Sequence, residues 1–136
     1  MSAPDPASPP NEFLVISRGQ WDAGLPPETI QEAIDQFYSW IDVMVAEGKM
    51  KTGHRLATTG KVVSRSPGIT DGPYGETKEV IGGYWFVLAS DLDQAAEFMS
   101  GNPCIACGLS FELRPLEHVK ASAYEVTNET PGSAQA

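Results

Sequence analysis

Two segments of this sequence are apolar over almost their whole length, FLVIS (residues 13–17) and VIGGYWFVLA (residues 80–89). Both are rich in residues that favour β-structure, and both are predicted to be strands buried on both faces. Such a strand needs something packed against each side of its sheet. The need to cover both faces of the sheet therefore constrains the fold more than any other feature of the chain.

The remaining elements are predicted from the spacing of apolar residues and from the residues that begin and end helices and strands. A helix with one apolar stripe is predicted between Pro27 and Gly48, and a shorter helix is predicted after Ser90. Further strands are predicted at residues 56–64 and 109–115, with a hairpin excursion after the first of them. The order of elements is therefore β-α-β-β-α-β.

This order is the split unit of ferredoxin-like α+β folds, here with an extra hairpin. Both helices would lie on one face of an antiparallel sheet, and no segment remains to cover the other face. A second copy of the sheet is the simplest cover. The sequence thus predicts a homodimer whose sheets face one another, with a pocket in any space left between them.

Length and charge limit the function further. The 136 residues suffice for one domain, predicted at residues 12–125 between disordered segments at 1–11 and 126–136. The net charge of −9 argues against a nucleic-acid partner, which would need a basic face. We expect no membrane partner and a cytoplasmic location, because no apolar run could span a bilayer and the N-terminal residues lack the features of a secretory signal.

The segment TDGPYGETKEVIGGYWFV (residues 70–87) resembles the signature of the YCII-related, or DGPF-domain, family, with tyrosine in place of the phenylalanine in that name. FELRP (residues 111–115) is similar to the closing strand of the family, and a first strand that ends in Arg-Gly also fits. The resemblance covers residues 12–116. It implies a dimeric α/β barrel, in agreement with the homodimer inferred from strand burial.

The resemblance implies less about activity, because the family is largely uncharacterised. Its fold relatives include muconolactone-isomerase-like enzymes and small oxygenases that work without a metal. Shorter members carry a His-Asp pair proposed as catalytic, with the histidine on the first helix. The predicted first helix of this chain contains no histidine, so that chemistry does not carry over. Resemblance to members encoded beside extracytoplasmic-function sigma factors suggests an accessory role.

The charged residues of the polar segment have two interpretations. In the first, Asp71 caps a turn and Glu76, Lys78 or Glu79 lines a pocket, with Asp71 and Lys78 as candidate ligand-binding residues and Glu79 as a candidate proton-transfer group. In the second, the hairpin charges are solvated or pair with one another and contribute little to stability. We expect Lys78 or Glu79 to line the pocket, because these two residues stand closest to the buried strand.

The closing strand offers a second charged pair. Glu112 and Arg114 share the face opposite Phe111 and Leu113, so both are expected to point into the interior between the two sheets, where an unpaired charge is costly. They could form an internal ion pair that fixes the dimer. Alternatively, Arg114 and Arg18 could bind a carboxylate ligand while Glu112 acts as a general base.

The histidines and cysteines add little chemistry. His54 could reach the mouth of a pocket and is a candidate ligand-binding residue, whereas His118 is expected at the surface. Two separate histidines and a CxxC segment lack the spacing of metal ligands, so neither a metal nor a cofactor is expected. Cys104 and Cys107 follow a helix, unlike a redox-active CxxC, and are interpreted as ordinary reduced thiols.

These observations favour two functions. The first is a barrel that binds a small polar or carboxylate metabolite, with isomerase- or lyase-like proton transfer by Glu112 or Glu79. In that case Arg18, Arg114 or Lys78 would stabilise the developing oxyanion. The second is a non-catalytic accessory or ligand-sensing protein that acts through a partner.

Overall fold

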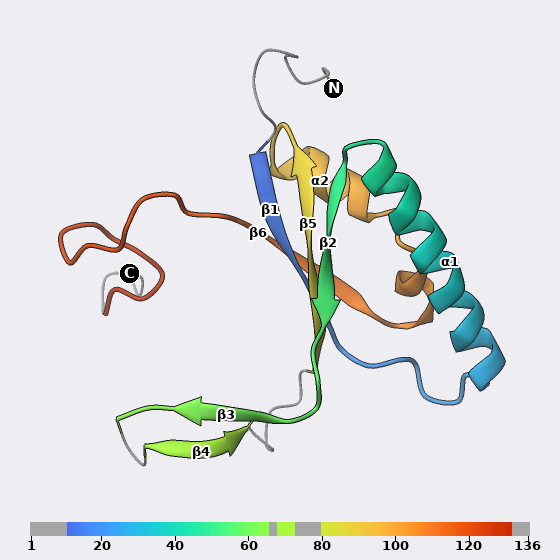
Figure 1. The fold of residues 1–136 in the computed structure, drawn as a ribbon, viewed down its shortest axis with the longest axis horizontal. Helices are drawn as coiled ribbons and strands as arrows, with labels where there is room; N and C mark the ends of the chain where they lie inside the picture. The colour runs from blue at the N-terminus through green and yellow to red at the C-terminus, as the bar shows by residue number, and fades with distance from the viewer. Residues whose placement is uncertain (1–10, 66–67, 73–79, 132–136) are drawn as a thin grey trace.

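The structure, a computed structural model, describes residues 11–65, 68–72 and 80–131. These residues form a four-stranded sheet with the strand order β2-β5-β1-β6 and a separate two-stranded ribbon of β3 and β4 (Figure 1). The strands are β1 (Asn11–Arg18), β2 (Met50–Arg55), β3 (Gly60–Val63), β4 (Ile69–Gly72), β5 (Ile81–Ala89) and β6 (Ser110–Pro115). The helices are α1 (Pro27–Ala46), α2 (Leu92–Met99) and the short 3-10 helix η1 (Pro103–Cys107).

The predicted fold class is confirmed. Strand β1 pairs antiparallel with both β5 and β6, and β2 pairs antiparallel with β5, as a ferredoxin-like β-α-β-β-α-β order requires. The β3–β4 ribbon is the extra hairpin, inserted between β2 and β5 and projecting away from the sheet (Figure 1). Both α-helices lie on one face of the sheet. Closure of two such sheets into a dimeric barrel stays a prediction.

The hydrophobic core lies between the sheet and the helices. Phe13 and Val15 of β1 face the helices, and so do Trp85 and Val87 of β5. Phe37 of α1 packs edge-on against Trp85, with ring centroids 5.3 Å apart. Full burial of one such side chain contributes about 1.5–3 kcal/mol to folding, so this layer holds the chain together.

The opposite face of the sheet, which we call the open face, is apolar at its centre. Its side chains alternate with those of the core along the two central strands and are half-buried; they are Leu14, Ile16, Tyr84, Phe86 and Leu88. No helix in the described ranges covers this face (Figure 1). Both central strands are thus apolar on both sides, as predicted, and the single chain fully buries only one of those sides.

The prediction of a strand at residues 56–64 is wrong. The sheet strand β2 begins at Met50, and residues 60–63 form β3 of the ribbon instead. In β2 only Met50 is buried, opposite Val87, while the following residues lie at the exposed edge of the sheet. An edge strand with a single buried side chain shows no alternation of apolar and polar residues. The sequence pattern therefore does not identify β2 as a strand.

The second helix begins one residue later than predicted. Asp91, not Ser90, is the N-cap, and its carboxylate accepts a hydrogen bond from the backbone N–H of Gln94 at 2.8 Å. The Gln94 side chain in turn accepts from the backbone N–H of Ser90 at 2.7 Å. This reciprocal pair satisfies two N–H groups at the start of the helix. Of the helices in the described segments, none combines the length and apolar character needed to cross a membrane.

Candidate functional site

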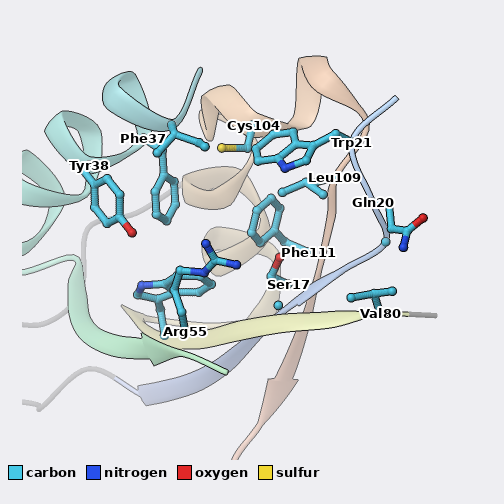
Figure 2. A pocket seen from close by; sticks show the side chains of 14 residues that line it. Ser17, Gln20, Trp21, Phe37, Tyr38, Arg55, Val80, Cys104, Leu109 and Phe111 are labelled. Carbon is cyan, nitrogen blue, oxygen red and sulfur yellow. The ribbon is translucent and has the colours of Figure 1, made fainter. Parts of the chain in front are cut away.

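A pocket with a cavity volume of about 370 Å³ lies between α1 and the helix-facing side of the sheet (Figure 2). Its walls come from the end of β1 and the loop after it, from α1 and η1, and from the starts of β5 and β6. The lining residues are Ser17, Gly19, Gln20, Trp21, Ile34, Phe37, Tyr38, Arg55, Val80, Gly82, Trp85, Cys104, Leu109 and Phe111. Most of them are aromatic or aliphatic, as in typical small-molecule sites.

One row of residues across the sheet forms the floor of this pocket. Ser17 of β1 pairs with Gly83 of β5 on one side and with Phe111 of β6 on the other, and Arg55 of β2 pairs with Gly83 from the far side. Successive strands place paired residues on the same face, so Ser17, Arg55 and Phe111 all point toward the helices. Gly83 leaves the space between Ser17 and Arg55 without a side chain of its own, and the Trp85 ring extends over it.

Glycines shape this end of the sheet. A Cβ added to Gly83 would lie 2.8 Å from the carbonyl oxygen of His54, so β2 and β5 approach too closely there for any side chain. The register shifts between Ser17 and Arg18, opposite Gly82, which marks a bulge in the ladder. A Gly-Gly pair within an apolar strand is typical of close backbone approach or of a bulge. Both occur, and both open the pocket.

Arg55 is the cation of this pocket. Figure 2 shows its guanidinium, the Tyr38 hydroxyl and the Ser17 hydroxyl all directed into the space between α1 and the sheet. Within the described part of the chain, Arg55 forms no ion pair, although five other basic residues do: Arg18, Lys49, Lys51, Lys61 and Arg114. Arg65 and Lys120 also form no ion pair in the described ranges, and like Arg55 they are exposed, but of these three residues only Arg55 lines the pocket.

Ser17 is the second polar group on the floor. The residue is 6% exposed, and no hydrogen bond links its hydroxyl to another group in the ranges that the structure describes. Its hydroxyl oxygen is not among the fully buried side-chain atoms that lack a partner, so it is accessible from the pocket that it lines. The Ser17 hydroxyl is therefore placed to meet a polar atom of a molecule in the pocket.

Cys104 contributes to the wall without being a nucleophile. Cys104 and Cys107 are free and buried, and they lie in η1. Burial, together with the neighbouring Cys107, raises the pKa of the Cys104 thiol to about 11. A thiol with that pKa stays protonated near neutral pH and presents a weakly polar surface.

Three of the predicted site residues meet on the other side of the sheet. The Arg18 guanidinium contacts Glu112 at 2.5 Å, and the Arg114 guanidinium contacts the second oxygen of Glu112 at 3.2 Å. This ion cluster lies beside the open face, because Glu112 pairs with Ile16 and Arg114 pairs with Leu14. Hydrogen bonds from Arg18 and then from Arg114 lower the pKa of Glu112, which makes its carboxylate a weaker base.

The Glu112→Gln variant should lower the melting temperature near neutral pH and lose this effect in acid. The folded-state pKa of Glu112 lies below its ordinary value of 4.5, so its stabilisation is fully present above that pH and is lost as the pH falls through the lowered pKa. Thermal unfolding of both proteins at about pH 7 and about pH 3 measures the difference. Glu97→Gln, on the exposed surface of α2, is the control. An equal deficit for Glu112→Gln at both pH values would contradict the ion cluster.

Of the other predicted site residues, His54 and Asp71 lie apart from the pocket. His54 pairs with Tyr84 and therefore points to the side of the open face, and Asp71 forms an ion pair with Lys61 across the β3–β4 ribbon. Lys78 and Glu79, together with Glu76, lie outside the described residues. In the described ranges, no three His, Cys, Asp or Glu side chains are grouped closely enough to hold a metal ion.

The sequence analysis missed the residues that line the pocket. Arg55 went unnoticed because its strand was placed too late in the chain, and Tyr38 because it stands beside the apolar stripe of its helix. Ser17 carried a usable signal, since it follows Phe13 and Val15 at alternate positions and shares their buried face. A small polar residue at a core position is a reason to look for a partner.

The sequence pattern of the YCII-related domain matches residues 12–119, most of the chain. The protein belongs to the YCII-related domain family. Membership confirms the resemblance seen in the polar segment and the closing strand, and it leaves the ligand and activity of this YCII-related protein open. No curated protein matches the sequence.

Proposed function

We propose that this YCII-related protein binds a small organic carboxylate in the pocket between α1 and the sheet, as a cytoplasmic ligand-sensing or accessory protein. The observation that carries this proposal is the Arg55 guanidinium, which points into an apolar pocket and has no ion-pair partner among the described residues. Guanidinium groups bind carboxylates through two parallel hydrogen bonds. The resemblance to proteins encoded beside sigma factors agrees with an accessory role.

The pocket supports binding better than proton transfer. Among its described lining residues there is no carboxylate and no imidazole, and the Cys104 thiol is protonated at neutral pH. The volume of about 370 Å³ falls at the lower end of the range for small-molecule sites. Arg55 is exposed at the rim of the pocket, so a carboxylate would bind there while the rest of the ligand lies against the aromatic walls.

The Arg55→Gln variant should bind small monocarboxylates at least about tenfold more weakly than the unaltered protein, because a hydrogen-bonded charge pair is lost. Trp21 and Trp85 line the pocket, so quenching of tryptophan fluorescence during titration reports binding. Arg65→Gln is the matched control, since Arg65 is exposed and does not line the pocket. Equal affinities of the two variants for every carboxylate tested would refute the proposal.

The proposal includes a homodimer formed through the open face. Five apolar side chains lie there, and apolar patches of this kind mark association sites. The charges around them include both signs: Glu12 pairs with Lys51 at 2.6 Å on one side, and Glu112 pairs with two arginines on the other. A second copy can therefore approach this face without the repulsion that a net charge of −9 would otherwise produce.

A further inference from the structure

We infer that the ligand of this pocket is an aromatic monocarboxylate, whose carboxylate is bound by Arg55 while its ring packs against Trp85. This inference rests on the proposed carboxylate binding and adds the class of molecule. It draws on three separate features of the pocket: its charge, its walls and the register of the strands beneath it.

The charge of the pocket sets the number of carboxylates. Arg55 is the only basic residue among the described lining residues, and no acidic residue stands beside it. One carboxylate would neutralise it. A second carboxylate would find no counter-charge among the described lining residues, in a chain that is already strongly acidic, and would lose hydration at the apolar walls without compensation.

The walls of the pocket favour a planar ring. Trp85 lies at the centre of an aromatic group, with its ring centroid 5.3 Å from Phe37 and 6.4 Å from Phe111. Tyr38 and Trp21 complete the lining on the helix and loop sides (Figure 2). Aromatic rings attract one another in edge-to-face and offset arrangements beyond what burial alone provides. A flat ring fits such a group better than an aliphatic chain of similar size.

The register of the sheet places the two halves of such a ligand together. Arg55 pairs with Gly83, and Trp85 follows Gly83 by two positions, so both side chains point to the same face on neighbouring strands. Gly83 has no side chain to separate them. A molecule that binds Arg55 with its carboxylate therefore has its ring at Trp85, and the Ser17 hydroxyl borders the same space from β1. A cavity of about 370 Å³ has room for a ring and its carboxylate.

Four probes test this inference on the full chain by calorimetry and tryptophan quenching. Benzoate should bind more tightly than each of the others. We expect cyclohexanecarboxylate, which has a ring but no aromatic face, to bind about tenfold more weakly. Benzamide, which lacks the charge, and phthalate, which has a second carboxylate, should each bind at least about tenfold more weakly.

The Arg55→Gln variant separates the inference from the proposed function. It should weaken benzoate binding while leaving benzamide binding unchanged, and Arg65→Gln should alter neither. If cyclohexanecarboxylate binds as tightly as benzoate and both need Arg55, the aromatic class is overturned and carboxylate binding stands. If benzoate binding does not depend on Arg55, or if benzoate does not bind at all, this inference fails. The comparison of probes on the unaltered protein needs no variant, so it holds even if a substitution disturbs folding.

Discussion

Replacing Gly53 by alanine should lower the free energy of unfolding by about 3 kcal/mol. A Cβ at this position would lie 1.9 Å from the carbonyl oxygen of Tyr84 and 2.7 Å from its carbonyl carbon. Those atoms belong to the backbone of β5, a central strand that pairs with β1 and β2 at once. Relief of the collision would therefore displace β2 from the sheet, together with Met50, which is 2% exposed in the core.

Gly82→Ala is the matched control for this variant, because it adds the same methyl group to the same region of the sheet. A Cβ there would meet the Ser17 hydroxyl oxygen at 3.5 Å, an ordinary contact. We expect it to change the free energy of unfolding by no more than about 1 kcal/mol. Urea unfolding followed by circular dichroism measures both variants, and equal stabilities would show that β2 does not pack against β5 as described.

The Ile16→Asp variant should abolish dimer formation and leave the fold of the single chain intact. Ile16 lies at the centre of the open face, between Tyr84 of β5 and Glu112 of β6. In a dimer formed through this face, the new carboxylate would be buried beside Glu112, whose two arginine partners are already engaged. Burial of an unpaired charge should weaken association at least about 100-fold. In the separate chain this side chain is half-buried at the surface, and the core does not change.

Sedimentation velocity at micromolar concentration tests this expectation. The unaltered protein should sediment as a dimer and Ile16→Asp as a monomer with an unchanged circular dichroism spectrum. Val63→Asp is the control, because Val63 is 75% exposed on β3 and lies outside the open face. The homodimer would be ruled out if the unaltered protein sediments as a monomer, and the assigned interface would be ruled out if Ile16→Asp still sediments as a dimer.

The pocket and the open face lie on opposite sides of one sheet, and β1 contributes to both. Ser17 borders the pocket, and the next residue, Arg18, belongs to the ion cluster with Glu112. The sequence analysis placed the ligand site in the interior between two sheets, with Arg18, Glu112 and Arg114 among its residues. The structure brings those three side chains together and satisfies Glu112 with two arginines. The described cavity lies on the other face.

The reason for this difference is the register of the strands. Alternation along β6 correctly separated Phe111 and Leu113 from Glu112 and Arg114, because side chains in a strand point to opposite faces in turn. Alternation does not show how far a strand is shifted against its neighbour. Four residues distant in sequence lie side by side across the sheet only because of the register of their strands; they are Arg55, Gly83, Ser17 and Phe111.

The sequence by itself determined the order of the elements, the fold class and the family. Apolar runs that are buried in a sheet, a helix stripe and a DGP-containing segment are local patterns, and each reflects burial or backbone geometry within a few residues. The edge strand β2 was not predicted from the sequence, because only Met50 of this strand lies in the core. The pocket was decided by tertiary structure alone. Its cation, its hydroxyls and its aromatic walls come from separate elements, and only the packing of α1 and η1 over one end of the sheet brings them around a common space.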